Sequence, residues 1–401
     1  MSAPQETGPR PLAGIPAQPG APAAAEPSAG RVRQAFDSFT GRAAGPYQAA
    51  VVRIGFGLAW AAYLLREWPN RRVLYGDRSP WSDALAARLL AENHAFTVLT
   101  WYHGRLWFEL VYQLAIVAAV LLVLGWRTRA SGALFLVTVL SLQNRNVLVG
   151  DGGDNVVHLM AVYLVVTRSA QVWSLDARRA RRARPGGGGD GRDGGGGGGG
   201  GRGAVWLWGL LGVALATGQP GRVWGLLWVL WLTAGVWYAV DRWRPDGEPR
   251  AVLDALANML HNCGMLVIAA QVVLIYSTAG WYKVQGSRWQ DGTALHYPLH
   301  LDYFVPWPGL SGLLGSSLLL VFLLSYGTVI LQVAFPFTLF NRRLKNVLLA
   351  LMMLEHAAIA VTLGLPFFSL AMIAADAVFL PSGFLRGVPG SVRRVLKGVR
   401  R

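Results

Sequence analysis

The stretch that decides the fold is residues 255–283, which read ALANMLHNCGMLVIAAQVVLIYSTAGWYK. It contains no Asp, Glu or Arg, and its one lysine, Lys283, is its last residue. A helix that crosses the hydrocarbon core of a bilayer needs about 20 predominantly apolar residues, at about 1.5 Å each. Residues 255–283 meet this requirement, so the sequence predicts a transmembrane helix that ends at Lys283.

Apolar stretches of similar length recur along the chain. The chain is 53% hydrophobic and 14% charged, whereas soluble domains carry about 25% charged residues, which argues against a soluble enzyme. We therefore predict an all-α fold, a polytopic transmembrane helical bundle of about eight core spans plus an inserted helical hairpin. The other core spans are predicted at 46–66, 107–125, 130–148, 153–173, 309–338, 345–364 and 366–380, and the hairpin helices at 204–217 and 222–240.

Pro- and Gly-rich segments separate these spans into parts. The glycine tract around residues 185–201 loses much backbone entropy on ordering, and the first residues of the chain lack an apolar period. The predicted order is a disordered cytoplasmic N-terminus (1–42), a first membrane part with four spans (43–175), a basic and Gly-rich cytoplasmic loop (176–203), the inserted hairpin (204–245), a second membrane part with four spans (250–381) and a basic cytoplasmic tail (382–401).

The chain is strongly basic, with 37 Lys and Arg against 21 Asp and Glu. In an apolar chain this excess indicates basic loops on the cytoplasmic side of a membrane rather than a nucleic-acid-binding surface. Placing the arginine-rich loops on one side gives about ten spans in a plasma membrane, with both termini cytoplasmic. The lipid bilayer is then the main partner, no nucleic acid is expected, and the long polar loops face outward: 67–106, 144–154 and 284–308.

The first candidate site lies in the sequence GDGGDNVVHL, where the span 153–173 begins. A helix that starts here brings Asp154, Asn155 and His158 together on its first turns, because residues three and four apart share a face. Asp154 also suits the N-cap, where a carboxylate accepts free N–H groups. His158 is a candidate catalytic residue because an ionisable group inside a membrane is costly; the alternative is a polar hydrogen bond between helices. No metal-ligand spacing is present, and the same stretch contributes the candidate substrate-binding residues Asp154, Asn155, Asn144 and Arg145.

The second candidate is Lys283, which closes its apolar span beside Trp281 and Tyr282. An ammonium in an apolar setting is poorly solvated, which favours the neutral amine that a general base requires. Trp281 and Tyr282 are expected to form a wall of this dry pocket and to bind the substrate. The alternative is a lysine whose charged end reaches water at the membrane surface.

The third candidate is the pair Glu355 and His356, well inside the predicted span 345–364. Neighbouring residues of a helix point about 100° apart, so the two side chains are expected to contact different helices. His356 is a candidate catalytic residue and Glu355 a candidate binding residue, with a structural hydrogen-bond network as the alternative. Arg53 is expected to pair with an acidic side chain inside the bundle, and Asp376 is interpreted in the same structural way.

Several of these motifs resemble the HTTM family, the membrane domain shared with vitamin K-dependent gamma-carboxylases. The resemblance rests on SLQNRN, GDGGDNVVHL, YSTAGWYKVQGSRWQDGTAL and LEHAAIAVTLGLPFFSLAMIAADAVFL. It covers residues 45–380, apart from the glycine-rich loop and the hairpin. Maturation factors of sporulation-delaying proteins, of the SdpB type, share the same domain.

In the carboxylases, a lysine of the matching segment deprotonates reduced vitamin K, whose reaction with oxygen leads to carboxylation of glutamate. The resemblance therefore implies that Lys283 is a catalytic base, that His158 and His356 are catalytic, and that a reduced quinone is the cofactor. The carboxylases also carry a sizeable extramembrane domain beyond their membrane core, which we do not expect after residue 381. Glutamate carboxylation thus stays open, and a quinone or another small substrate is favoured.

Two main functions follow from the sequence. The first is a membrane-embedded, quinone-using or carboxylase-like enzyme whose site faces outward. The alternative is a non-enzymatic membrane factor for the maturation, export or immunity of a secreted peptide, which would bind that peptide on its outer loops. A transporter is a third option.

Overall fold

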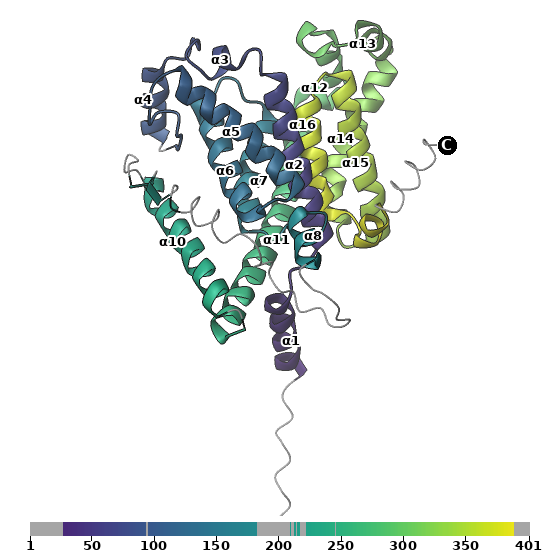
Figure 1. Ribbon diagram of the computed structural model, residues 1–401. Coiled ribbons are helices and arrows are strands. Elements are labelled where there is room, and N and C mark those ends of the chain that lie inside the picture. The colour runs from purple at the N-terminus through teal and green to yellow at the C-terminus, as the bar shows by residue number, and fades with distance from the viewer. Residues whose placement is uncertain are drawn as a thin grey trace, which may run out of the picture. The chain divides into compact units, whose positions relative to one another are not determined.

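The computed structural model of the chain describes residues 27–93, 95–182, 222–244 and 246–388, with a few residues between 209 and 216. Every regular element within these residues is helical (Figure 1), so the predicted all-α fold is confirmed. Residues Phe39–Arg401 form one compact unit, to which the description below refers.

The bundle is built from helices that pack against their neighbours in the sequence. They are α2 (Pro46–Arg66), α5 (Arg105–Leu124), α6 (Thr128–Arg145), α7 (Gly152–Val166), α11 (Glu248–Gln285), α14 (Leu318–Thr338), α15 (Arg342–Thr362) and α16 (Pro366–Asp376). Each helix in this order contacts the next one. α16 also packs back on α2 and α7, so the last helix of the bundle lies beside the first (Figure 1).

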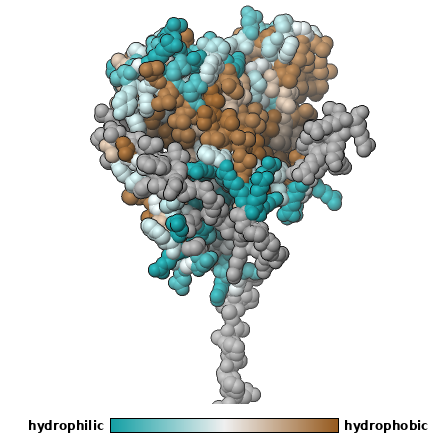
Figure 2. Space-filling model, in the orientation of Figure 1, coloured by the Kyte–Doolittle hydropathy of each residue, from teal (hydrophilic) through white to brown (hydrophobic). Residues whose placement is uncertain are grey.

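Five of the described helices are long and apolar enough to cross a membrane, namely α2, α5, α11, α14 and α15. A bent pair, Pro366–Phe379 followed by Ser382–Val388, brings the number to six if it counts as one span. On the face shown in Figure 2, hydrophobic residues gather across the middle of the bundle, with hydrophilic residues above and below. These helices indicate a membrane protein, but the predicted count of about eight core spans is not confirmed.

The length and polarity of α6 and α7 explain part of this difference. α7 has 15 residues, which is about 22 Å of helix and shorter than the hydrocarbon core of a bilayer. α6 has polar side chains on its buried face, among them Ser131, Thr138, Ser141 and Arg145. Because α7 packs against α2, α6, α11 and α16, protein surrounds it on several sides, and a short helix is tolerated there.

The predicted span 309–338 is two helices. α13 (Pro308–Gly315) ends before Ser316, and α14 begins at Leu318. The hydroxyl of Ser317 accepts a hydrogen bond from the backbone N–H of Leu320 (3.4 Å), as an N-cap residue does. The span in this part of the chain is therefore α14 alone.

The N-terminal segment and the inserted region differ from the prediction in part. Residues Pro27–Gly41 form the helix α1, so the prediction that 1–42 is disordered is wrong for this stretch. After Pro27 this stretch has no further proline and contains helix-forming Arg, Gln and Ala. The basic loop begins with α8 (Leu175–Arg182), and the second hairpin helix is α10 (Arg222–Trp243). Residues 1–26, 183–208 and 389–401, and most of 204–217, lie outside the described residues.

Short helices connect the long ones. α3 and α4 lie between α2 and α5, whereas α12, α13 and the 3-10 helices η1 to η3 lie between α11 and α14. Their bounds are α3 (Arg71–Leu74), α4 (Asp83–Asn93), α12 (Ser287–Gln290), η1 (Ala294–His296), η2 (Pro298–His300), η3 (Asp302–Phe304) and, after α16, η4 (Ala377–Phe379).

Arg53 on α2 is fully buried, but the acidic partner predicted for it is wrong. Its guanidinium donates to backbone carbonyls: Nε to Ser169 (3.2 Å), Nη1 to Val123 (2.8 Å) and Leu122, and Nη2 to Trp173 (2.9 Å). The C-terminal carbonyls of a helix lack partners within the helix, so a buried arginine satisfies them here in place of water.

Candidate functional site

The C-terminal end of α11 forms one side of the candidate site. α11 ends at Gln285, and the backbone N–H of Gly286 donates to the carbonyls of Tyr282 (3.0 Å) and Lys283 (3.1 Å). α12 then turns the chain back, so that Nζ of Lys283 lies 5.1 Å from the ring centroid of Trp289. A Cβ on residue 286 would be 3.0 Å from Cδ1 of Trp289, so this close return favours glycine.

A cavity of about 200 Å³ opens beside Lys283. An apolar cavity of about 150 Å³ accepts a benzene ring, so this one has room for a single substituted ring. The hydroxyl of Tyr326 donates to the carbonyl of Gln290 (2.5 Å), which ties α14 to α12 next to the cavity. The lining is mainly aromatic and aliphatic, from Val284, Trp289, Tyr326 and Val329, with Lys283 and Gln290 as its polar side chains.

A line of hydrogen bonds leads from Lys283 into the bundle. Nζ of Lys283 donates to Oε1 of Gln332 on α14 (2.8 Å), and Nε2 of Gln332 donates to Oε1 of Glu355 on α15 (2.9 Å). Gln332 is only 6% exposed, so both ends of its amide are used inside the protein. The amine is thus hydrogen-bonded to a neutral amide, and that amide in turn donates to the carboxylate of Glu355.

A second set of polar side chains lies deeper along α11. Tyr276 is two helical turns before Lys283, about 10 Å along the helix axis. Its hydroxyl lies 3.0 Å from Nε2 of His356 on α15 and 3.0 Å from both carboxylate oxygens of Asp376, the last residue of α16. We call Tyr276, His356 and Asp376 the buried triad.

Three of the predicted site residues, Lys283, Glu355 and His356, lie in one region of the bundle. Gln332 links Lys283 to Glu355, and His356 bonds to Tyr276 on the helix that carries Lys283. The prediction that Glu355 and His356 contact different helices is confirmed: Glu355 bonds to α14 and His356 to α11. Trp281 and Tyr282 are 62% and 74% exposed and do not line the cavity beside Lys283. The prediction that they form its wall is therefore wrong.

α7 begins at Gly152, one residue before the predicted span, and its N-cap is Asp151 and not Asp154. The carboxylate of Asp151 accepts from the N–H groups of Gly153 (2.6 Å) and Asp154 (3.1 Å), while that of Asp154 accepts from the N–H of Asp151 (2.9 Å). These reciprocal bonds form a capping box, in which Asp154 is the third helical residue. Asn155, on the same turn, is exposed.

His158 bonds to the neighbouring helix and lies apart from the Lys283 site. Its Nδ1 lies 3.0 Å from Oε1 of Gln143 on α6, and Nε2 of Gln143 donates to the carbonyl of Asp154 (2.9 Å). This is the hydrogen bond between helices that the sequence offered as the alternative to catalysis. Among the described residues, His158 has no hydrogen bond to Lys283, Glu355 or His356.

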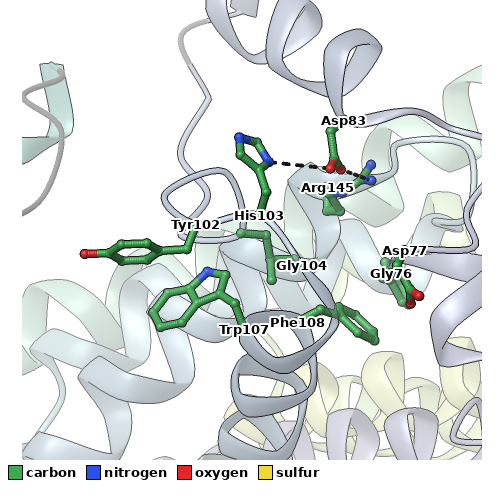
Figure 3. A pocket seen from close by; sticks show the side chains of 11 residues that line it. Gly76, Asp77, Asp83, Tyr102, His103, Gly104, Trp107, Phe108 and Arg145 are labelled. Atoms are coloured by element: carbon green, nitrogen blue, oxygen red, sulfur yellow. Dashed lines mark hydrogen bonds and ion pairs between the residues drawn. The ribbon is translucent and has the colours of Figure 1, made fainter.

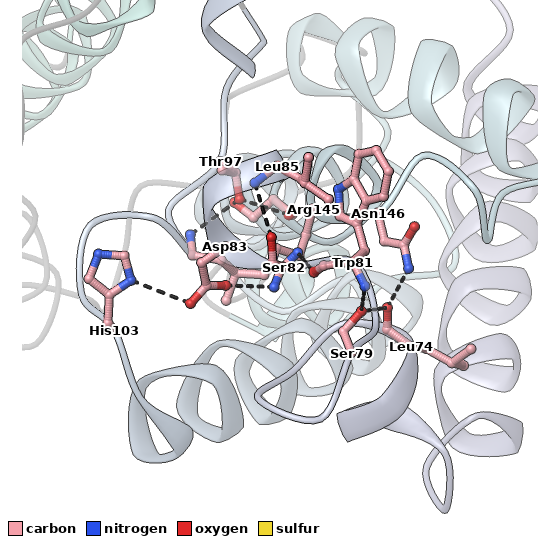
Figure 4. A network of polar contacts seen from close by, with 12 residues as sticks. Leu74, Ser79, Trp81, Ser82, Asp83, Leu85, Thr97, His103, Arg145 and Asn146 are labelled. Atoms are coloured by element: carbon pink, nitrogen blue, oxygen red, sulfur yellow. Dashed lines mark hydrogen bonds and ion pairs between the residues drawn. The ribbon is translucent and has the colours of Figure 1, made fainter. Parts of the chain in front are cut away.

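Asn144 and Arg145, at the end of α6, hold the segment that precedes α5. Nη2 of Arg145 lies 2.6 Å from Oδ1 of Asp83, and Nη1 donates to the carbonyl of Trp81 (3.0 Å; Figure 4). Nδ2 of Asn144 donates to the carbonyl of Phe96 (2.8 Å). The Arg145 side chain is only 5% exposed, so these contacts give both residues a structural role.

A second cavity, of about 40 Å³, lies next to Arg145 (Figure 3). Asp83 lies between Arg145 and His103, whose Nδ1 is 3.5 Å from Oδ2 of the carboxylate (Figure 3). On the same lining, the hydrogen bonds from Arg72 lower the pKa of Asp77 to about 2. A space of this size holds about one water molecule, so it does not compete with the cavity beside Lys283 as a ligand site.

Tyr276, Gln332 and Trp289 are among the residues of the site that were not predicted from the sequence. Tyr276 is seven residues before Lys283, so helical periodicity places both on one face and could have indicated it. Gln332 is the one amide in the apolar run of α14, which is a weaker signal. Trp289 could not be predicted from the sequence, because its position over Lys283 depends on the turn at Gly286.

Among the described residues, no group of three or more His, Cys, Asp or Glu side chains is placed to hold a metal ion. No protein-family model, curated protein or solved structure matches this chain.

Proposed function

We propose that this protein is an integral, multi-pass enzyme of the plasma membrane, in which Lys283 is a general base that acts on a small aromatic hydroxyl compound such as a reduced quinone. The resemblance to the HTTM family supports this function. The arginine-rich loops support cytoplasmic termini and a site that faces outward. The observation that carries the proposal is the position of Lys283 beside a cavity of about 200 Å³ and in a hydrogen bond to a neutral amide.

The residues of the cavity suit such a ring. Trp289 and Tyr326 offer aromatic surfaces, and Val284 and Val329 offer apolar contacts. A reduced quinone, when bound, supplies a hydroxyl proton and two electrons. Gln332 keeps the amine of Lys283 in place, and because the amide is neutral, Lys283 gains and loses a proton without breaking an ion pair.

The substitution Lys283→Arg tests this role. Arginine keeps the positive charge but does not lose it, so it preserves a surface lysine and abolishes a base. We expect the variant to fold and, with dissolved oxygen as the electron acceptor, to oxidise menadiol, a simple reduced quinone, at least about 100-fold more slowly than the wild type, after the rate without protein is subtracted. The rate is measured by quinone absorbance with purified protein. The matched control is Lys345→Arg on α15. In the wild type, Nζ of Lys345 donates to the carbonyl of Phe379 (2.5 Å), and this lysine is not in the site.

Equal rates for the wild type and Lys283→Arg contradict the base role. Native mass spectrometry of the purified protein provides the second measurement, because a quinone-using enzyme should retain a quinone. A wild-type protein that neither retains a quinone nor oxidises menadiol favours the alternative, a non-enzymatic factor for the maturation, export or immunity of a secreted peptide.

A further inference from the structure

We infer that the buried triad of Tyr276, His356 and Asp376 is a proton-accepting site, which takes up one proton at His356 and holds it on Asp376. The three side chains come from α11, α15 and α16 and are 2%, 3% and 0% exposed. Ionisable groups at such depth in a membrane protein are costly, and they commonly take part in proton or ion pathways.

The hydrogen bonds of the triad allow two arrangements. The Tyr276 hydroxyl has one hydrogen and lies 3.0 Å from His356 and 3.0 Å from both oxygens of Asp376. In the first arrangement, the hydroxyl donates to an ionised Asp376, and Nε2–H of His356 donates to the hydroxyl oxygen. In the second, a protonated Asp376 donates to the hydroxyl oxygen, the hydroxyl donates to Nε2, and the histidine hydrogen is on Nδ1.

The second ring nitrogen of His356 is the open end of this chain of hydrogen bonds. Nδ1 is buried and has no hydrogen-bond partner in the part of the chain that the structure describes. Buried polar atoms nearly always have a partner, so an exception calls for a reason. Here, Nδ1 is a free acceptor in the first arrangement and carries the hydrogen in the second, which makes it the atom where a proton arrives or leaves.

Uptake of one proton converts the first arrangement into the second. A bond forms between the proton and Nδ1, the proton of Nε2 moves to the Tyr276 oxygen, and the original hydroxyl proton of Tyr276 moves to Asp376. The triad changes from one negative charge to none, and no other reactant is consumed. The rings of Phe335 and Phe368 lie 5.6 Å from Tyr276 and 5.5 Å from His356, so the neutral form suits these apolar surroundings.

Two charged side chains act on the triad from outside it. Glu355, next to His356 on α15, interacts electrostatically with Tyr276 and Asp376. Lys283 on α11 interacts electrostatically with His356. The protonation of Asp376 does not rest on the proposed function.

Infrared absorption of the full chain in lipid nanodiscs tests the inference. We expect the carbonyl band of a protonated carboxylic acid at neutral pH, which shifts when aspartate carboxyls carry carbon-13 and is absent in Asp376→Asn. The labelled wild type assigns the band to an aspartate without any substitution, and Asp376 is the one described aspartate that is fully buried, so the test stands even if Asp376→Asn does not fold. Lys283→Arg should keep the band, which separates this inference from the proposed function.

The route through His356 is tested by exchange in heavy water. In His356→Gln the Asp376 proton should exchange at least about tenfold more slowly than in the wild type, because Nδ1 is lost. The control is His103→Gln, because the His103 side chain is 73% exposed and distant in the sequence. In this variant the Asp376 proton should exchange at the wild-type rate. A labelled wild type without the protonated band, or equal exchange in His356→Gln and wild type, overturns the inference.

Discussion

Arg53 joins parts of the chain that are far apart in the sequence. Its guanidinium donates to Val123, at the end of α5, and to Ser169 and Trp173, in the segment after α7. The side chain is fully buried, so these hydrogen bonds form away from water. One residue of α2 thus ties the end of α5 to the segment between α7 and α8.

Replacing Arg53 with leucine should destabilise the protein strongly. The variant leaves several buried carbonyls without donors, at about 1–3 kcal/mol for each. We expect a loss of about 3 kcal/mol or more in the free energy of unfolding, measured as a fall of the thermal midpoint in detergent. The control is Arg66→Leu on the same helix, whose side chain is 61% exposed and 3.5 Å from Glu67, and it should change stability by less than about 0.5 kcal/mol. Similar losses in both variants contradict this account.

The pair of Arg72 and Asp77 should give a small, acid-sensitive contribution to stability. Arg72 donates to both carboxylate oxygens (2.9 and 2.5 Å), which lowers the pKa of Asp77 to about 2. A carboxyl with a lowered pKa stabilises the fold above its ordinary value near 3.8, and this contribution disappears as the pH falls towards 2. Because the pair is close to solvent, its contribution is small.

The measurement compares the thermal midpoints of the wild type and Asp77→Asn over this pH range. The wild type should be more stable at neutral pH, and the difference should vanish at the acid end. A difference that grows as the pH falls has the wrong sign and contradicts the assignment. Glu92→Gln is the control, because Glu92 and its partner Arg88 are more exposed.

The sequence predicted which residues have unusual positions better than it predicted their partners. The sequence singled out Lys283, Glu355 and His356 because a polar side chain in an apolar helix is conspicuous. Their contacts depend on the rotation and spacing of several helices, which a single sequence does not contain. Arg53 is an example, because the predicted carboxylate is replaced by backbone carbonyls, which every segment of the chain offers.

The contact between α2 and α16 is unusually close. A Cβ on Gly55 would lie 2.4 Å from Cβ and 3.2 Å from Cα of Ala374. Small residues at helix contacts let backbones approach closely, which is a main source of packing between membrane helices. Because α16 is the last helix of the bundle and α2 the first, Gly55 and Ala374 are where its two halves meet.

Gly55→Ala should push α2 and α16 apart and cost about 1–3 kcal/mol. Gly327→Ala on α14 is the matched control, since nothing lies within 4 Å of the added Cβ, and alanine should stabilise that helix slightly. The double variant Gly55→Ala, Ala374→Gly exchanges the two side chains and should regain part of the loss. Thermal unfolding measures all three, and a double variant no better than Gly55→Ala would show that the contact is not the cause.

Helix positions were predicted well where an apolar run has a clear end. The predicted span 46–66 is α2, and the run that ends in Lys283 is most of α11. The break at Ser316 and Ser317 was missed, because two serines in an apolar run do not by themselves end a transmembrane helix. The cap that starts α14 there is a local hydrogen bond, which becomes visible only in three dimensions.

The two ends of the bundle carry different chemistry. At one end, the carbonyl and N–H of Ala44, just before α2, bond to His261 (2.8 Å) and Asn262 (2.7 Å) of α11. The carbonyl of Leu380, after α16, accepts from Gln48 at the start of α2 (2.7 Å). From His261, α11 runs through the bundle to Lys283, so the cavity lies at the other end.

The number of spans was the least predictable property of the molecule. A count of spans from composition and loop charge depends only on the length and polarity of each segment, so every apolar run is counted as a separate crossing. α7 and α6 lie against other helices, which supply partners for polar groups and shorten the path that must be apolar. This burial of α6 and α7 against other helices is a property of the assembled bundle and not of any one segment.

Cysteine labelling tests whether the two ends face opposite sides of the membrane. The native Cys263 is exposed, so it is first replaced by serine. In that background, Ser287→Cys lies on α12 beside the cavity, and Arg179→Cys lies on α8. α8 is held close to the end of α5 and to Arg53, because the backbone N–H of Asp176 donates to the carbonyl of Gly125 (3.0 Å). Because arginine-rich segments stay cytoplasmic, an impermeant maleimide should label Ser287→Cys on intact cells and Arg179→Cys only after permeabilisation. Labelling of both from outside would contradict the sidedness, and with it an outward-facing Lys283, whereas the packing of the bundle would be unaffected.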